Sequence, residues 1–546
     1  MKSQGNIMKR SKLIVLYLLL FSAIIFAQKI TIDLNIEYQT IDGFGGFGPK
    51  KVWWDSPPFY DEEYLDMILD DLGCTIVRTQ LYWDFEEAND NDDPNLINWN
   101  GFNFGPNSDN GKQFPFIMAL RDRGLDKFIA SVWTPPVWMK LDPDDGLASF
   151  CNGQCGGRLN PELYEEFAEY IIAYIKMLKD ETDVDLYAIS LQNEPLFANP
   201  FESCVYKEAE LAELVKVVGP RLRKEGLSTK IFGPEHMGSY SWELNFINEL
   251  MARDSLAREN LDIFAVHGYL DGFSADYGKA LGWTQLFNAC TKYGKPIWMS
   301  ETSDYETTGW DKAFKMARGL HLALKFGKIS AWIYWYMSGD MLNDNVPAPL
   351  YYVFKNYYRY IRPGYIQVDS QSDDSEILVT AFRKDEKITI VLINNSLQEK
   401  TATLDFGAVP MPKAFQVFQT SRTDNCVDLG VVKNNQFILK ANSVTTLYKD
   451  IDTSVEQGDG GSSDRSQSSG LHEIEIFPNP TNGFFLIRNA QNSTIQLYNV
   501  NGRMVREVHC NKESFKMDLN GLASGIYLVK IARAGDQVFK KISYQK

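Results

Sequence analysis

The sequence predicts an α/β protein: a closed (β/α)8 TIM barrel with an attached β-sandwich, plus a small C-terminal β-sandwich-like domain. Three observations lead to this expectation. Short apolar segments alternate with segments of helical period over about 300 residues, strand patterns without helical period follow from about Tyr365, and a Gly/Ser-rich stretch separates a last strand-rich region. Alternating strands and helices indicate a parallel sheet covered on both faces, and eight such units favour a closed barrel over an open sheet.

Eight segments are candidates for the barrel strands. Each is short and rich in β-branched or aromatic residues, and the first leads into a Gly-rich turn. In chain order they are "QTIDGFGGFG" (39–48), "TIVRTQ" (75–80), "FIASVW" (128–133), "LYAISLQ" (186–192), "KIFGPE" (230–235), "IFAVHGY" (263–269), "PIWMSE" (296–301) and "SAWIYWY" (330–336).

Residues 160–181 illustrate the helices that we expect between these strands. An apolar stripe recurs at helical spacing, Asn160 can cap the N-terminus, and Pro161 suits the first turn. The stripe is interpreted as core packing, and it consists of Leu163, Phe167, Ile171, Tyr174 and Leu178. No glycine-rich phosphate-binding fingerprint opens any of the helices, so we expect no dinucleotide and no other cofactor.

The rest of the chain divides by composition. Residues 28–38 are expected to supply the first strand or strands of the side β-sandwich, 39–364 the catalytic barrel and 365–450 the remaining sandwich strands. The polar Gly/Ser-rich residues 451–470 predict a linker, and 471–546 predict a compact β domain. We expect a monomer.

The N-terminus predicts export. Lys9, Arg10 and Lys12 precede an apolar run that ends at Ala27, which is typical of a signal peptide spanning residues 1–27; an uncleaved anchor is the alternative. The whole chain carries a formal charge of −16, and because residues 1–27 hold four basic and no acidic residues, the remainder carries −20. Such a chain is repelled by phosphate backbones, which argues against a nucleic-acid partner.

Seven cysteines in 546 residues do not make a disulfide framework. Cys151 and Cys155 lie in one Gly-rich loop and Cys204 in the loop after Glu194, so we expect one bridge between those two loops. Zinc is the weaker interpretation, because no histidine stands near the cysteine pair.

Two predicted strands end in a carboxylate. Glu194 follows the fourth strand and Glu301 ends the seventh, 107 residues later. In a barrel both lie at the C-terminal face, where active sites form. Paired carboxylates there are what glycoside hydrolysis requires, one as proton donor and one as nucleophile or base. A single such glutamate would as readily be structural.

Aromatic residues accompany the two carboxylates. Trp133, Tyr269, Trp298 and Trp335 fall at or near strand ends, where aromatic rings can stack on sugars, although about half of the 12 Trp are expected to fill the core. The five histidines are spread over separate segments, so we expect neither a metal cluster nor a Ser-His pair.

At these positions the sequence resembles glycoside hydrolase family 30. "GFGG", "ASVWTPPVWMK" (130–140), "AISLQNEP" (188–195), "PIWMSE" and "YYRYIRPGY" (357–365) occur in the family's order, over roughly residues 29–450. The resemblance implies a retaining glycosidase in which Glu194 is the acid/base and Glu301 the nucleophile. It also implies a sugar subsite lined by Arg78, Trp133, Asn193, His267, Tyr269 and Trp335.

The C-terminal region resembles the type IX secretion sorting domain of Bacteroidetes. "IFPNPTNG" (476–483), "IQLYNVNGRMV" (495–505) and "LASGIYLVKI" (522–531) carry this resemblance. It implies that the secretion machinery is a partner, that this domain is removed, and that the enzyme is secreted or held at the cell surface. A carbohydrate-binding module is the alternative.

The substrate is predicted less directly. "SLQNEP", "VHGY" and "WIYWYMSGD" resemble the xylanase branch, whose glucuronoxylanases use basic side chains in the loops after strands seven and eight to bind a uronic acid. Here these loops carry Asp304, Glu306, Asp340 and Asp344 and neither Arg nor Lys, so an acidic branch would meet like charge. We therefore expect an endo-acting xylanase for neutral xylan, acting on a plant or algal polysaccharide.

Three alternatives remain open. The first is hydrolysis of β-1,6-linked glucan or galactan, and the second is a glucosylceramidase-like activity. The third comes from another class, a noncatalytic glycan-binding protein on the same scaffold. Loss of either Glu194 or Glu301 would have indicated that third alternative, and both are present.

Overall fold

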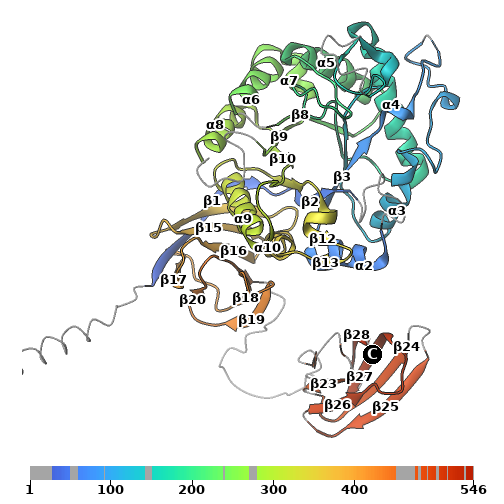
Figure 1. Ribbon diagram of the computed structural model, residues 1–546. Helices are drawn as coiled ribbons and strands as arrows, with labels where there is room; N and C mark the ends of the chain where they lie inside the picture. Colours follow the sequence, from blue (N-terminus) through green and yellow to red (C-terminus); the bar gives the residue numbers. More distant parts are fainter. Residues whose placement is uncertain are drawn as a thin grey trace, which may run out of the picture. The chain divides into compact units, whose positions relative to one another are not determined.

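A computed structural model describes residues 27–48, 60–91, 93–141, 151–237, 240–269, 280–449 and, with short gaps, 474–544 (Figure 1). The chain forms two compact units, Met1–Ser454 and Val455–Lys546. The apolar core of the predicted signal peptide and the predicted linker lie outside the described residues. None of the helices in the described ranges has the length and apolarity that a membrane span needs.

The centre of the first unit is a closed barrel of eight parallel strands, which confirms the predicted fold class. Each predicted barrel segment coincides with one of its strands. In barrel order these are β10 (Ile297–Glu301), β11 (Ala331–Tyr334), β2 (Gly43–Phe47), β3 (Ile76–Leu81), β4 (Phe128–Val132), β7 (Ala188–Ser190), β8 (Lys230–His236) and β9 (Ile263–His267). β3 and β8 extend one residue beyond the predicted ends.

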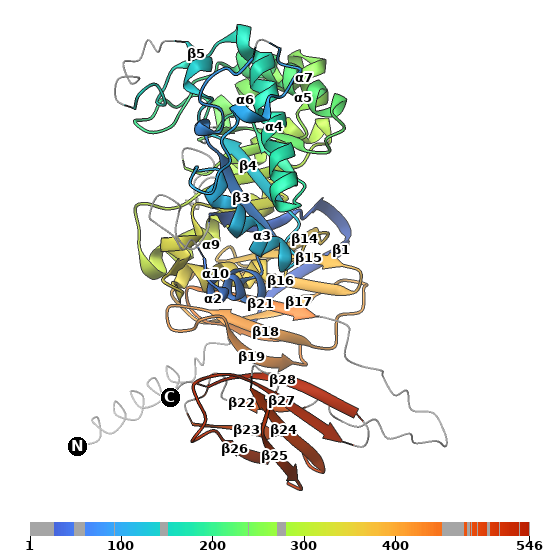
Figure 2. The same cartoon turned by 90° about the vertical axis from the view of Figure 1, so that its right-hand side faces the viewer.

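Helices surround the barrel on its outer side (Figures 1 and 2). Four residues of the predicted stripe, Phe167, Ile171, Tyr174 and Leu178, lie on α4 and are fully buried. Leu163 lies in the turn before α4 and is partly buried against the same core. Asn160 accepts a hydrogen bond from the backbone NH of Glu162, capping a short 3-10 turn that leads into α4. The described helices include α2 (Glu62–Leu65), α3 (Phe114–Asp122), α4 (Tyr164–Thr182), α5 (Glu208–Lys224), α6 (Tyr240–Ile247), α7 (Ser255–Asn260), α8 (Ala280–Cys290), α9 (Gly309–Lys325) and α10 (Pro349–Tyr358).

The glycines of "GFGG" allow β2 to pack against β3. A Cβ on Gly45 would lie 1.7 Å from the backbone oxygen of Ile76. Backbone atoms cannot move aside as a flexible side chain can, so only glycine fits. The motif therefore serves barrel closure at this position.

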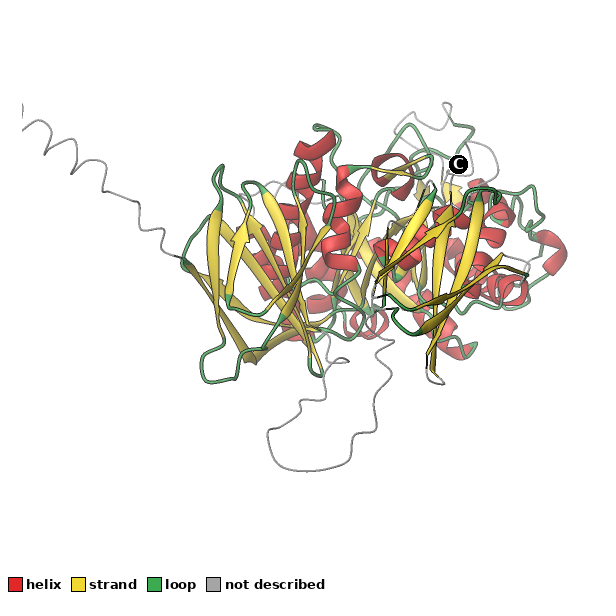
Figure 3. Cartoon of the chain, turned by 90° about the horizontal axis from the view of Figure 1, so that it is seen from below, coloured by secondary structure: helices red, strands yellow, loops and turns green. Residues whose placement is uncertain are grey.

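Beside the barrel lies one nine-stranded sheet that curls around its own apolar core. Figure 3 shows this part as strands without helices of its own. The N-terminal β1 (Gln28–Thr40) lies within it, antiparallel to β14 (Ile366–Ser372) and parallel to β17 (Lys400–Asp405). The other members are β15 (Ile377–Lys384), β16 (Lys387–Asn394), β18 (Phe415–Thr420), β19 (Val427–Val432), β20 (Gln436–Leu439) and β21 (Ser443–Lys449).

The second unit consists of two small antiparallel sheets around a separate core. One contains β22 (Glu475–Phe477), β23 (Phe484–Arg488) and β26 (Ser514–Asp518). The other contains β25 (Met504–Cys510), β24 (Ser493–Asn499), β27 (Gly525–Arg533) and β28 (Asp536–Tyr544). This arrangement agrees with the predicted sandwich-like domain.

The expected disulfide between two loops is wrong. Cys151 is bonded to Cys155 within the same Gly-rich loop, while Cys204 is a free, buried thiol. The Cys204 thiol lies 3.7 Å from the backbone oxygen of Gly157. The bonded pair is four positions apart in the sequence, and the turn between them brings the two Cα atoms to 5.5 Å, an ordinary separation for a disulfide.

Candidate active site

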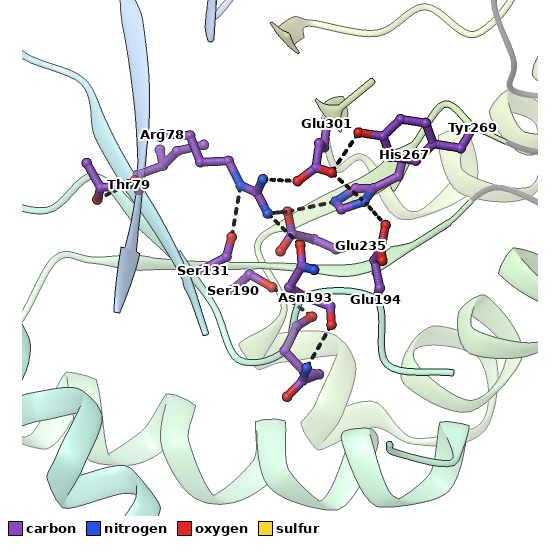
Figure 4. Close-up of polar contacts among 12 residues, drawn as sticks. Arg78, Thr79, Ser131, Ser190, Asn193, Glu194, Glu235, His267, Tyr269 and Glu301 are labelled. Atoms are coloured by element: carbon purple, nitrogen blue, oxygen red, sulfur yellow. Dashed lines mark hydrogen bonds and ion pairs between the residues drawn. The ribbon is translucent and has the colours of Figure 1, made fainter. Parts of the chain in front are cut away.

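The barrel brings the predicted carboxylates together at its C-terminal end (Figure 4). Glu301 is the last residue of β10, and Glu194 follows β7 by four residues. The backbone NH of Asn193 donates to Val132 at 2.7 Å and that of Glu194 to Glu235 at 3.2 Å, so the segment after β7 stays between its neighbouring strands. Pro195 follows in a turn that ends this segment.

A carboxylate oxygen of Glu194, one of Glu301 and a ring nitrogen of His267 all lie within 4.8 Å of one another. All three residues are buried; Glu194 and Glu301 are 7% and 6% exposed. Among the described residues this is the one group of acidic, His and Cys side chains whose spacing would suit a metal ion. A pair of closely spaced carboxyl groups is also what glycosidases use on either side of the sugar bond that they cleave.

Arg78 lies at the centre of the hydrogen-bond network around Glu301. Its side chain is fully buried. Its guanidinium donates to Glu301, to Asn193 Oδ1 at 2.8 Å, to Glu235 at 3.1 Å and to Ser131 Oγ at 3.1 Å. Such charge-assisted contacts to several acceptors hold the planar group in one orientation.

Glu301 has hydrogen-bond donors on both oxygens. Arg78 donates to Oε2, and the Tyr269 hydroxyl donates to Oε1 at 2.7 Å. His267 Nδ1 lies 3.8 Å from Oε1. The carboxylate is therefore fixed in orientation, as an attacking group must be.

Glu194 lies in a different environment. Its Oε1 lies 3.0 Å from His267 Nδ1. Burial raises the pKa of Glu194 above its ordinary value, although the hydrogen bond and charge of His267 oppose the rise. A carboxyl group that keeps its proton is suited to act as a general acid.

His267 bridges two of the acids. Burial alone would lower its pKa, but Glu301, Glu194 and Glu235 outweigh burial and raise the pKa of His267 to about 9. At neutral pH the ring is therefore protonated, and both of its nitrogens can donate, to Glu194 and, at 3.4 Å, to Glu235. The His267 ring therefore fixes the position of the Glu194 carboxyl group relative to that of Glu235.

Glu235 is the residue that the sequence analysis missed. It lies near the end of β8, is fully buried and contacts both Arg78 and His267. Burial would raise its pKa, yet the charges of Arg78 and His267 lower the pKa of Glu235 to about 2. The signal was present, because "KIFGPE" ends in a glutamate as "PIWMSE" does.

The aromatic predictions divide into two groups. The Trp133 ring lies 4.6 Å from the Arg78 guanidinium and 5.9 Å from Trp335, so both indoles belong to the site. Trp298 does not belong to it: it is fully buried in the barrel interior, and its indole nitrogen donates to Asp42, the residue before β2. A side chain in a β-strand points to one face only, and residue 298 points into the barrel three positions before the strand end.

Lysines neutralise much of the charge on the two acidic loops. Lys315, on α9, lies 2.9 Å from Asp304 and 3.2 Å from Glu306. Lys312, also on α9, lies 3.0 Å from Asp340. The two loops themselves contain no basic residue, as the sequence showed. Because α9 supplies Lys312 and Lys315, these loops should repel a carboxylate-bearing substrate branch less than their sequences alone indicate.

We expect the Glu235→Gln substitution to change the pKa of His267 and not only the stability of the fold. Without the Glu235 charge the pKa of His267 should fall, and kcat should drop at least about tenfold because the ring loses its contact at Nε2 and orients Glu194 less firmly. NMR titration can follow the ring, since the chain has only five histidines. Glu306→Gln, which changes an exposed carboxylate, is the control. If the His267 titration is the same in Glu235→Gln as in the parent, Glu235 does not have this role.

Two family models match the chain. Residues 92–259 match "O-Glycosyl hydrolase family 30", and residues 475–545 match "Secretion system C-terminal sorting domain". Glucuronoxylanase XynC of Bacillus subtilis (strain 168) is 25% identical over 441 residues, which cover 78% of this chain and 92% of that protein. Endo-1,6-beta-D-glucanase BGN16.3 of Trichoderma harzianum is 27% identical over 257 residues, 45% of this chain and 48% of that one.

The same fold occurs in solved structures. A GH30 endoxylanase from Clostridium papyrosolvens C71 superposes with a TM-score of 0.63 at 23% identity, covering 77% of this chain and 99% of that chain. At this identity the likeness establishes the fold.

Proposed function

Because the chain is a retaining glycoside hydrolase of family 30 with a C-terminal secretion sorting domain, we propose that it is a secreted endo-acting xylanase for neutral xylan. The observation that best supports this chemistry is that one carboxylate oxygen of Glu194, one of Glu301 and a ring nitrogen of His267 lie within 4.8 Å of one another. Retaining enzymes hold their two carboxyl groups about 5 to 5.5 Å apart, and inverting enzymes hold them about 6.5 to 9.5 Å apart. The close approach supports the retaining geometry.

The proposed roles follow from the two environments. Glu301, oriented by Arg78 and Tyr269, attacks the anomeric carbon and forms a glycosyl ester. Glu194 gives its proton to the leaving oxygen, then removes a proton from the water that hydrolyses the ester. Asn193 binds the sugar beside Glu194, and Trp133 and Trp335 supply aromatic faces for sugar rings.

Xylan is proposed from two lines of support. The Bacillus subtilis (strain 168) relative, which covers 78% of this chain, is a glucuronoxylanase by name, and the two loops after β10 and β11 contain no basic residue to bind a glucuronate. The second candidate is a β-1,6-glucan, favoured by the named activity of the Trichoderma relative.

The test is hydrolysis of a panel of polysaccharides by the full chain. We expect activity on unbranched xylan or arabinoxylan to equal or exceed that on glucuronoxylan. Lys312→Ala and Lys315→Ala should shift the ratio further toward neutral xylan, because each leaves an acid unpaired. Cleavage restricted to positions beside glucuronate would contradict the proposal, and preference for β-1,6-glucan would select the second candidate.

The pH dependence should follow the role of Glu194. The rate should fall as pH rises through the pKa of Glu194, which burial raises, because the deprotonated group cannot protonate the leaving oxygen. The alkaline limb of kcat/KM should therefore lie above the pKa of about 4.3 of an exposed glutamate. A substrate with a phenolic leaving group needs less acid assistance, so its kcat/KM should fall less steeply at alkaline pH. The same fall for both kinds of substrate would contradict the role of Glu194 as the general acid.

A further inference from the structure

An exposed aromatic side chain lies beside the candidate active site, and none of the proposed chemical steps uses it. Tyr305 is in the loop after β10, four residues after Glu301, and is 73% exposed. A single exposed ring on a protein surface needs no explanation by itself. The position of this ring, next to residues of the site, is what makes it informative.

The Tyr305 ring stacks on a residue that contacts Glu301. The centroids of the Tyr305 and Tyr269 rings lie 6.0 Å apart, and the two ring planes are inclined by 26°. The Tyr269 hydroxyl donates to Glu301 Oε1 at 2.7 Å, as Figure 4 shows. Tyr305 therefore continues the surface of the site outward, one ring beyond Tyr269. A polysaccharide extends past the sugar that is attacked, so its neighbouring units must pass over side chains at this border.

The loop that carries Tyr305 is fixed by the preceding residue. Asp304 is only 4% exposed, and its carboxylate accepts hydrogen bonds from the Thr307 hydroxyl and, at 3.2 Å, from the backbone NH of Glu306. Lys315 Nζ lies 2.9 Å from the same carboxylate. A tyrosine has few rotatable bonds, so a tyrosine on a fixed backbone loses little conformational freedom when a sugar binds to it.

The surroundings of the ring favour a neutral sugar. A tyrosine offers an apolar face together with a hydroxyl group, and a sugar offers C–H faces together with hydroxyl groups. Asp304 and Glu306, on either side of Tyr305 in the chain, share the single amino group of Lys315. The local charge is therefore negative, so a uronic acid at this position would gain no attraction.

We propose that Tyr305 is a substrate-binding residue that stacks on the sugar unit next to the one attacked by Glu301. The inference rests on the proposed function for the identity of the sugar chain. A unit next to the reacting one is held alike in the bound substrate and in the transition state. The contact should therefore lower KM and leave kcat nearly unchanged.

The first experiment measures binding of xylohexaose to the full chain carrying Glu194→Gln, which prevents hydrolysis. Adding Tyr305→Ala should weaken this binding about three- to tenfold, whereas Tyr305→Phe, which keeps the ring, should change it less than about twofold. Leu397→Ala is the control, at a residue that is 84% exposed and lies between β16 and β17 of the nine-stranded sheet. If Tyr305→Ala binds as tightly as Leu397→Ala does, the proposal is wrong.

Kinetics separate sugar binding from a role in positioning Tyr269. With Glu194 restored, Tyr305→Ala should raise KM for xylohexaose about three- to tenfold and leave kcat within about twofold of the parent. Tyr269→Phe removes the hydroxyl that donates to Glu301 but keeps the ring. If Tyr305 acted only through that hydroxyl, Tyr305→Ala would lower kcat in the parent and would have no further effect in Tyr269→Phe. This outcome would overturn the proposal.

A failure of the proposed substrate gives a different result. If the parent neither binds nor cleaves xylohexaose but cleaves a β-1,6-linked glucohexaose, the xylan assignment is wrong. The same variants are then compared on that oligosaccharide. A KM that rises in Tyr305→Ala but not in Tyr305→Phe supports the stacking role, and an unchanged KM in both variants refutes it.

Discussion

Glu301→Gln and Glu194→Gln should each lower kcat on xylan by at least about 10²-fold while the protein stays folded. An amide in place of Glu301 keeps the hydrogen-bonding shape but cannot form the glycosyl ester. An amide in place of Glu194 cannot deliver a proton to the leaving oxygen, a contribution of typically 10² to 10⁴ in rate. The measurements are initial rates and thermal unfolding, with Glu306→Gln as the exposed control.

Azide distinguishes the two roles. Glu301→Ala leaves space beside the anomeric carbon, so azide should restore turnover of a substrate with a good leaving group and give a glycosyl azide of inverted configuration. In the parent enzyme, proton NMR should show the β-anomer as the first product, because two displacements retain configuration. Initial release of the α-anomer, or full activity in either Gln variant, would contradict the assignment.

Arg78→Met should be the most destabilising single change in the site. The substitution leaves the buried Glu235 and Glu301 without the guanidinium that both contact, and breaking a buried ion pair costs about 3 to 5 kcal/mol. Activity should also be lost, since Glu301 and Asn193 lose a shared donor. Arg422→Met, which removes an exposed ion pair with Asp311, should cost at most about 1 kcal/mol.

The pH dependence of stability tests whether the broken ion pair causes the loss of stability in Arg78→Met. In the parent the pKa of Glu235 is lowered to about 2, so its contribution is complete above the pKa of an unfolded glutamate, about 4.3, and is lost as pH falls toward 2. In Arg78→Met burial dominates and the folded pKa rises above the unfolded one. Lowering the pH from 7 to 4 should then stabilise the variant relative to the parent. The same pH slope in both proteins would contradict the ion-pair explanation.

The sequence by itself determined the barrel and the two principal site residues. Six of the eight strands fall inside the segments found from apolar runs and turn residues, and β3 and β8 extend one residue beyond theirs, because strands buried in a parallel sheet are predominantly apolar. Glu194 and Glu301 could be predicted as site residues because each places a charge at the C-terminal end of an apolar strand. Barrels of this kind have their active sites at that end. The two sandwich-like regions followed from alternation without helical period.

Only the tertiary structure decided how these residues are paired. Glu235 lies near the end of β8, much as Glu301 ends β10, but its role depends on Arg78 and His267, which lie 157 and 32 residues away in the chain. The lysines that neutralise Asp304 and Asp340 come from α9 rather than from the loops themselves. Cys151 and Trp298 likewise have partners that spacing alone did not reveal. Local patterns report whether a residue is buried and in which kind of element, whereas charge and hydrogen-bond partners depend on distances in space that the closed barrel sets.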